Sequence, residues 1–352
     1  LFTDVGNGKT LIAGAITDRG VPTDPSDTFS AMAGNIGEIG KLIEKNGDLL
    51  FIKESPDHGG AIYAITSDDN YIYVGGGGSL GNQTVKKLNK SDLSVVATSP
   101  DYGGAIRAIT SDDNYVYVGG TGFDQRVRKL NKSNLSLVAT STFGYSEDIL
   151  ALTSDDNYIY MGGTGQRVRK LNKSDLSLVA TSPSYGGVIY ALTIDDNYIY
   201  VGGTAAQKIQ KLNKSDLSVV ATNPGYGGAV YAITSDDNYV YAGGASTQAV
   251  RRFNKSNLQL VATSPSYGGT IYALTIDDNY IYVGGQTSQT VMKIDMLTTI
   301  LPLVVESPSY GGIIYALTID DNFIYAGGAT DQKVKKLNKS VYELDGIDYV
   351  RI

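Results

Sequence analysis

The chain has 352 residues, a formal net charge of −7, no cysteine and a single histidine. Without cysteine there are no disulfides, no thiol catalysis and no cysteine-ligated zinc, and one histidine excludes a multi-histidine metal centre. The negative charge argues against nucleic acid or an anionic membrane as a partner, and no apolar run approaches the roughly 18 residues of a transmembrane helix. We therefore expect a folded protein with no nucleic-acid partner, no membrane insertion, no metal and no cofactor.

Residues 1–47 differ in character from the rest of the chain and predict a helical connector segment. Two short helices are expected, over residues 9–17 and residues 28–39. Apolar residues in the second helix follow the i, i+3, i+4, i+7 spacing of an amphipathic helix, namely Phe29, Met32, Ala33 and Ile36.

Two stretches of this segment carry a resemblance. They read Gly-Asn-Gly-Lys-Thr-Leu-Ile-Ala-Gly-Ala-Ile-Thr-Asp-Arg-Gly-Val-Pro-Thr from Gly6 and Ser-Asp-Thr-Phe-Ser-Ala-Met-Ala-Gly-Asn-Ile from Ser26. This wording resembles a segment that recurs in tail and minor structural proteins of phages and prophages of Gram-positive bacteria. The resemblance implies a place in the virion tail and contact with other tail proteins through residues 1–40. By analogy with tail fibres it also suggests a homotrimer.

From residue 48 onward the chain is a repeat array. Asp-Asp-Asn occurs seven times at intervals of 40 to 44 residues, starting at Asp68, Asp112, Asp155, Asp195, Asp236, Asp277 and Asp320. Each unit contains four short β-branched or aromatic runs bounded by turn residues, the composition of β-strands. Four strands in about 40–45 residues are typical of a β-propeller blade. The sequence thus resembles seven-bladed β-propellers over residues 48–340, an all-β fold, and leaves residues 341–352 as a C-terminal tail.

The strand count predicts how the ring closes. The seventh repeat loses its pattern after Asn338, whereas a spare strand-like run, Asp48–Pro56, precedes the first repeat. We expect this N-terminal strand to complete the seventh blade, so that no sheet edge is left open. The alternative uses part of residues 341–352 as that strand.

Strands alternate in direction within a blade, so the connections fall on two faces. The turn face carries the Asp-Asp-Asn turns between first and second strands and the Asn-Lys-Ser turns between third and fourth strands. The loop face carries the loops between second and third strands, which differ in every repeat, and the loops that lead from one blade into the next. Binding residues usually lie on loops held by a rigid scaffold, so we expect any ligand at the loop face; the alternative is that these loops vary because nothing restrains them.

Two rings of candidate ligand-binding residues lie on the loop face. One is a glutamine that ends each loop between second and third strands: Gln83, Gln125, Gln166, Gln207, Gln248, Gln289 and Gln332. The other is an aromatic residue in each loop between blades: His58, Tyr102, Tyr145, Tyr185, Tyr226, Tyr267 and Tyr310. Tyrosine rings and amide groups together suit a saccharide. The structural alternative is that the glutamines cap loop backbones and the tyrosines pack between blades.

The second and third blades break the symmetry. The third blade is entered through Ser-Thr-Phe-Gly-Tyr-Ser-Glu-Asp, where other repeats read Ser-Pro-Ser-Tyr-Gly-Gly, and Arg107 replaces a first-strand tyrosine. An asymmetric ligand site is therefore expected at Arg107, Phe123, Asp124, Tyr145, Glu147 and Asp148.

No catalytic motif stands out, because the only imidazole, His58, lies where sister repeats carry tyrosine. We expect a non-enzymatic, tail-associated protein of the virion that recognises a host-surface glycan or protein. One alternative is a structural tail or baseplate spacer. Another is a lectin-like propeller, secreted or on a bacterial surface.

Overall fold

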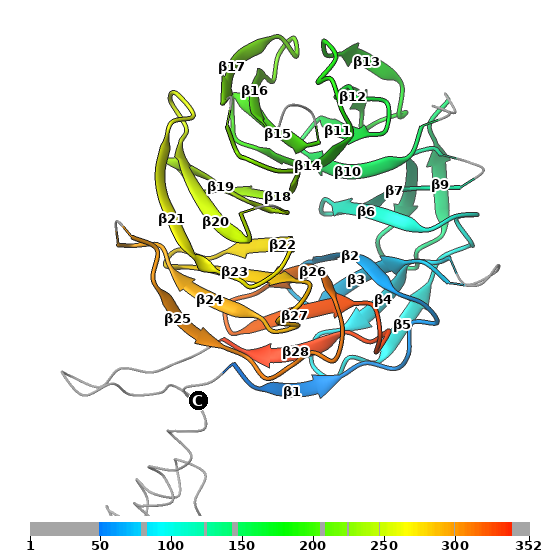
Figure 1. The fold of residues 1–352 in the computed structure, drawn as a ribbon. Helices are drawn as coiled ribbons and strands as arrows, with labels where there is room; N and C mark the ends of the chain where they lie inside the picture. Colours follow the sequence, from blue (N-terminus) through cyan, green and yellow to red (C-terminus); the bar gives the residue numbers. More distant parts are fainter. Residues whose placement is uncertain are drawn as a thin grey trace, which may run out of the picture. The chain divides into compact units, whose positions relative to one another are not determined.

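The computed structural model describes residues 49–78, 83–122, 125–142, 147–204, 208–223, 225–245, 247–298 and 300–339. The chain divides into two compact units, of which Phe51–Leu337 forms a β-propeller (Figure 1). The helices expected over residues 9–17 and 28–39, and the tail over residues 341–352, lie outside the described residues.

Each blade is a four-stranded antiparallel sheet, and in six of the seven blades the strands lie side by side in chain order. The first strands, which surround the centre of the ring, are β2 (Ile62–Ser67), β6 (Ile106–Ser111), β10 (Ile149–Ser154), β14 (Ile189–Ile194), β18 (Val230–Ser235), β22 (Ile271–Ile276) and β26 (Ile314–Ile319). The second strands are β3 (Tyr71–Gly76), β7 (Tyr115–Gly120), β11 (Tyr158–Gly163), β15 (Tyr198–Gly203), β19 (Tyr239–Gly244), β23 (Tyr280–Gly285) and β27 (Phe323–Gly328). The third strands are β4 (Lys86–Asn89), β8 (Arg128–Asn131), β12 (Arg169–Asn172), β16 (Ile209–Asn213), β20 (Ala249–Asn254), β24 (Met292–Asp295) and β28 (Lys335–Asn338). The outer strands are β5 (Val95–Thr98), β9 (Leu137–Thr140), β13 (Leu178–Thr181), β17 (Val219–Asn223), β21 (Leu260–Ser266), β25 (Leu303–Glu306) and β1 (Phe51–Glu54).

The seventh blade takes its outer strand from the start of the propeller. β1 pairs antiparallel with β28, so that Phe51 faces Leu337 and Glu54 faces Lys335. The side-chain hydroxyl of Ser55 accepts a hydrogen bond of 2.8 Å from the backbone N–H of Val334. The expected closure by the N-terminal strand is thus present, and it gives every blade four strands. No helix in the described part of the chain is long and apolar enough to cross a membrane.

Each second strand ends in two glycines, of which the first faces the next blade and the second faces the start of the first strand of its own blade. A Cβ added to Gly202 would lie 2.5 Å from a side-chain methyl of Val230 in the next blade, and one on Gly203 would lie 1.9 Å from the carbonyl oxygen of Val188. The same approach closes the ring, where Gly327 of the seventh blade meets Ile62 of the first. Only a residue without a side chain permits these contacts, which explains the Gly-Gly pair in every repeat.

The first aspartate of Asp-Asp-Asn has two functions on the turn face. One oxygen of Asp68 accepts backbone N–H groups from Asn70 and Tyr71, at 3.0 and 2.8 Å, which fixes the turn as expected. The other accepts the hydroxyl of Tyr73 at 2.8 Å and lies 3.1 Å from the ammonium of Lys132 in the next blade. We call this group of aspartate, tyrosine and lysine the interblade clasp.

The clasp recurs at other interfaces between blades, and at one of them the lysine is missing. Further Asp–Lys pairs of 3.0 to 3.2 Å are Asp112–Lys173, Asp155–Lys214, Asp195–Lys255 and Asp320–Lys90. Between the fifth and sixth blades Met296 stands where other repeats carry this lysine, so Asp236 keeps the hydroxyl of Tyr241, at 2.7 Å, and has no lysine partner among the described residues.

The chain enters and leaves the propeller on the turn face. β28 ends at Asn338, and the corresponding asparagine in the first blade, Asn89, opens a turn between third and fourth strands. β1 starts beside that end, since Phe51 pairs with Leu337 and the N–H of Asn338 donates to the carbonyl of Leu50. Both connections to residues outside the propeller are therefore opposite the loop face.

Candidate functional site: the mouth of the central channel

The tyrosines of the loops between blades are buried connectors. Tyr102, Tyr185, Tyr226, Tyr267 and Tyr310 are at most 3% exposed. The hydroxyl of Tyr185, for example, donates to the carbonyl of Lys208 in the next blade, and burial raises its pKa. Their rings and hydroxyls are engaged inside the protein, as in the structural alternative, and these tyrosines do not line the central channel. Tyr145 lies outside the described residues.

The loop glutamines shape the backbone on which these aromatic residues are fixed. Gln125, Gln166, Gln248, Gln289 and Gln332 have positive φ angles of 40° to 59°. The backbone carbonyl of each of five loop glutamines accepts the N–H of the aromatic residue ahead, in the pairs Gln83–Tyr102, Gln166–Tyr185, Gln248–Tyr267, Gln289–Tyr310 and Gln332–His58. These glutamines thus act first through their backbone; Gln207 lies outside the described residues.

The structure describes three residues of the expected asymmetric site, Arg107, Glu147 and Asp148. Glu147 forms an ion pair with Arg169, and Asp148 accepts a hydrogen bond of 3.1 Å from the side chain of Gln125. Arg107 lies on β6 and lines the central channel. Phe123 and Asp124 lie outside the described residues. Among the three described members of this group, Arg107 is the one that lines the channel, where other side chains remain available to a ligand.

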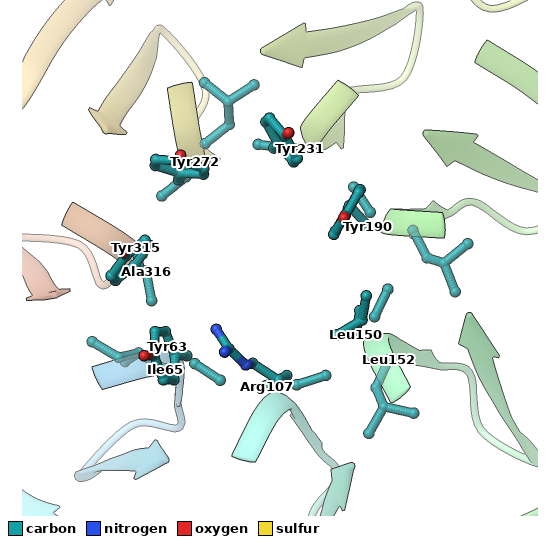
Figure 2. Close-up of a pocket in the computed structure, with 18 of the residues that line it drawn as sticks. Tyr63, Ile65, Arg107, Leu150, Leu152, Tyr190, Tyr231, Tyr272, Tyr315 and Ala316 are labelled. Atoms are coloured by element: carbon teal, nitrogen blue, oxygen red, sulfur yellow. The ribbon is translucent and has the colours of Figure 1, made fainter. Parts of the chain in front are cut away.

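The channel is lined by alternate residues of the seven first strands. Each inner strand begins with a buried aliphatic residue that packs between blades, so the next side chain faces the axis. At this position the blades carry Tyr63, Arg107, Leu150, Tyr190, Tyr231, Tyr272 and Tyr315, which surround the opening in Figure 2. A ring of isoleucine and leucine follows, from Ile65 to Leu317.

The ring of side chains that includes Tyr63, Arg107 and Leu150 lies at the loop-face end of the channel. Gly77, which directly follows β3, marks this end, because a Cβ on Gly77 would be 3.1 Å from the ring of Tyr63. All seven side chains are half-buried. Together with the neighbouring alanine, isoleucine and leucine residues, they line an open cavity of about 190 Å³. That is smaller than the roughly 300–1,000 Å³ of sites that enclose a drug-sized ligand, so the cavity suits one unit of a larger molecule.

The five tyrosines of this ring form a continuous aromatic arc. Ring centroids are 4.9 Å apart for Tyr190–Tyr231, 5.3 Å for Tyr231–Tyr272, 5.3 Å for Tyr272–Tyr315 and 5.1 Å for Tyr315–Tyr63. Tilted and edge-to-face pairs at such distances are favourable. Burial raises the pKa of the Tyr231, Tyr272 and Tyr315 hydroxyls, so these groups stay neutral. Among the described residues the hydroxyls of Tyr231 and Tyr315 have no hydrogen-bond partner, which leaves them free to bind a ligand.

Arg107 continues the arc on the other side of Tyr63. Its guanidinium carbon lies 3.7 Å from the centroid of the Tyr63 ring, the geometry of a cation–π contact. Its side chain extends toward the middle of the opening (Figure 2). Nε is buried without a partner, and no described residue accepts a hydrogen bond from this guanidinium. Leu150 of the third blade then interrupts the ring of polar side chains.

No group of three or more histidine, aspartate or glutamate residues that could hold a metal ion occurs in the described ranges. The chemistry at the channel mouth is that of aromatic faces, phenolic hydroxyls and one guanidinium. Such a surface can stack on the apolar face of a sugar, donate to its hydroxyls and pair with an oxyanion.

Sequence reasoning singled out Arg107 and missed the arc beside it. The five arc tyrosines read as ordinary strand residues because tyrosine also occurs in the second strands and in the loops between blades. The signal was the alternation within each first strand, where a buried aliphatic residue precedes the tyrosine. In a ring of blades that alternation directs the second position to the axis.

No family model matches this sequence, and no curated protein matches it either. Solved structures do. The crystal structure of the WD40 β-propeller domain of Doa1 superposes with a TM-score of 0.70 at 14% identity, covering 82% of this chain and 96% of that one. The crystal structure of the computationally designed Ika8 protein superposes with a TM-score of 0.62 at 19% identity, covering 83% of this chain and 99% of that one.

This chain has a seven-bladed β-propeller fold. At these identities the likeness concerns the fold alone. A propeller is compatible with binding, and the side chains at the channel mouth of this propeller determine what it can bind.

Proposed function

We propose that this protein binds a host-surface glycan through the loop face of its propeller, as part of a phage or prophage tail. The observation that carries the proposal is the aromatic arc at the channel mouth. Four consecutive ring contacts give a curved apolar wall with phenolic hydroxyls along it. Sugars offer apolar faces and many hydroxyls, which this combination matches.

The polarity of the propeller supports this orientation. Both connections to the rest of the chain leave from the turn face, next to Asn338 and Phe51. The loop face, with the channel mouth, is therefore the end of the propeller at which these connections do not leave. The tail assignment rests on the phage-like wording of residues 6–36, and contact with other tail proteins through residues 1–40 belongs to the same proposal. Several copies on one particle would raise a weak single-site affinity through avidity.

We also propose that the protein acts by binding, without catalysis. Its only imidazole, His58, is 3% exposed and lies among the interblade contacts, so it is not placed to serve as a general base for a ligand at the channel mouth.

The test is binding of the labelled full chain to intact Gram-positive cells and to the polysaccharides stripped from their walls. Saturable binding that one polysaccharide competes away is the expected result. Absence of binding across a broad panel of strains would overturn the proposal in favour of a structural spacer. Detection of the chain in purified virus particles, as against the culture fluid alone, tests the tail assignment separately.

A further inference from the structure

Arg107 is the only charged side chain among the residues that line the channel mouth. The other lining residues are tyrosine, alanine, isoleucine and leucine. A guanidinium loses hydration in such surroundings and is normally compensated by a carboxylate or by carbonyl oxygens. The two nearby acidic residues of the third blade are engaged elsewhere: Glu147 with Arg169, and Asp148 with Gln125.

The position of the guanidinium is fixed by packing. The cation–π contact with Tyr63 holds the guanidinium of Arg107 against one wall of the opening. Nε is buried, so the exposed edge of the group consists of its two terminal nitrogens, which Figure 2 shows directed into the opening. A guanidinium edge of this kind recognises a planar or tetrahedral oxyanion through two parallel N–H···O bonds.

We propose that the channel mouth binds an oxyanion, a phosphate diester or a carboxylate, attached to a sugar or polyol. The oxyanion pairs with the terminal nitrogens of Arg107, and the attached hydroxylated carbons lie along the arc from Tyr63 through Tyr315 and Tyr272. Within the lining of the channel mouth, Arg107 is the single positive charge to which an oxyanion can pair. This inference deepens the proposed function and rests on it for the ligand's location on a cell surface.

The decisive variant is Arg107→Tyr. Five of the seven blades carry tyrosine at this position, so the variant restores the repeat and is expected to fold. The matched control is Arg167→Gln, which removes one positive charge from an exposed loop-face arginine that donates to the carbonyl of Ser182. Comparing the two variants separates the loss of a specific contact between Arg107 and the ligand from the loss of one positive charge on the loop face.

Three polymers serve as probes: poly(glycerol phosphate), a polyuronate, and neutral dextran. Wild-type protein is expected to bind one of the two anionic polymers, with affinity that falls as salt rises; which one distinguishes phosphate from carboxylate. Arg107→Tyr should weaken that binding by about 10-fold to 100-fold, the loss that removal of a charge-assisted bond produces, while Arg167→Gln stays within about twofold of wild type. Equal affinity of wild type and Arg107→Tyr, equal losses in both variants, preference for dextran, or no binding to either anionic polymer would each overturn the proposal.

A second readout does not depend on a polymer. Inorganic phosphate or acetate should shift the Nε–H resonance of Arg107, which is assigned by its absence in Arg107→Tyr; an unchanged resonance at saturating anion would contradict the site. The outcomes also separate the two proposals. If Arg107→Tyr binds cells as well as wild type, the oxyanion site fails and glycan recognition stands. If phosphate binds at Arg107 but the protein binds no cells, the oxyanion site stands and host recognition fails.

Discussion

The guanidinium of Arg107 lies 3.7 Å from the ring of Tyr63, and this contact joins the one charge of the channel mouth to a continuous arc of five tyrosines. The pair comes from equivalent positions of adjacent blades. The internal repeat thus builds a ring of similar side chains, which Arg107 and Leu150 make asymmetric. A ligand that enters such a ring meets an aromatic wall on one side and a positive charge at its end.

Substitutions in the aromatic arc can separate the contribution of the tyrosine rings to ligand affinity from that of the hydroxyls. We expect Tyr272→Ala to reduce affinity for the recognised polysaccharide by about 10-fold or more, because it removes an apolar face at the centre of the arc. Tyr272→Phe keeps the ring and should lose at most about the fivefold to tenfold of one neutral hydrogen bond. Calorimetric titration of both variants measures the difference, and a larger loss for phenylalanine than for alanine would contradict stacking.

Close approach of neighbouring blades at the glycine pairs predicts a strong stability effect. Gly202→Ala places a methyl group 2.5 Å from a methyl of Val230, so either the side chain or the blade must move. We expect the free energy of unfolding to fall by about 1–3 kcal/mol, as for other overpacked sites.

The matched control for that change is Gly225→Ala. An added Cβ at Gly225 meets no atom within 4 Å, and its substitution should leave the urea midpoint nearly unchanged. If both alanine variants unfold at the same urea concentration, the interpretation of the glycine pair is wrong.

The interblade clasp offers an internal comparison, because one of its sites lacks a lysine. Asp112→Ala leaves Lys173 without its carboxylate, whereas Asp236→Ala strands no lysine. We expect Asp112→Ala to lower the free energy of unfolding by about 1–3 kcal/mol and Asp236→Ala by less. Met296→Lys should rebuild the missing pair and add up to about 1 kcal/mol.

Chemical denaturation at neutral pH measures these three changes. For Asp112, burial opposes ionisation, but hydrogen bonds from Lys173, the turn backbone and Tyr117 outweigh it and lower the pKa of the carboxyl. The contribution of the clasp is therefore complete above the ordinary pKa of aspartate and is lost as the pH falls through the lowered value. Equal losses for Asp112→Ala and Asp236→Ala would refute a role for the lysine.

His58 predicts a separate acid response at higher pH. Burial, followed by the charge of Lys86, lowers its pKa from 6.5 to about 4. Between these values the unfolded chain takes up a proton that the folded chain does not, so stability falls as the pH drops from 6.5 to 4, by roughly 3 kcal/mol in total.

The variant His58→Tyr tests this response. Sister loops carry tyrosine at this position, with its hydroxyl bonded to the next blade, as Tyr185 is to Lys208. We expect the variant to fold and to keep its stability between pH 6.5 and 4, with acid unfolding only where the carboxylates are protonated. An unchanged slope of stability against pH in this range would show that His58 is not the responsible group.

Much of the fold follows from the sequence because the same pattern of turns and strands occurs in every repeat. Asp-Asp-Asn turns and four strands per unit predicted the seven blades, and the spare strand ahead of Ile62 predicted the closure by β1. The site was harder, because a tyrosine in a strand can face the axis, a neighbouring blade or solvent. Burial of Tyr185 and exposure of Tyr231 to the channel depend on how the blades are arranged around the ring, which no single repeat encodes.

The most direct test of the account compares the two faces of one blade in the same assay. Binding of labelled protein to a susceptible strain is titrated for wild type, for Tyr231→Ala at the channel mouth, and for Asp237→Ala at the exposed turn of the fifth blade. Recognition at the loop face predicts that Tyr231→Ala loses most of its binding and that Asp237→Ala retains it. Loss in Asp237→Ala with retention in Tyr231→Ala would place recognition on the turn face and contradict the account.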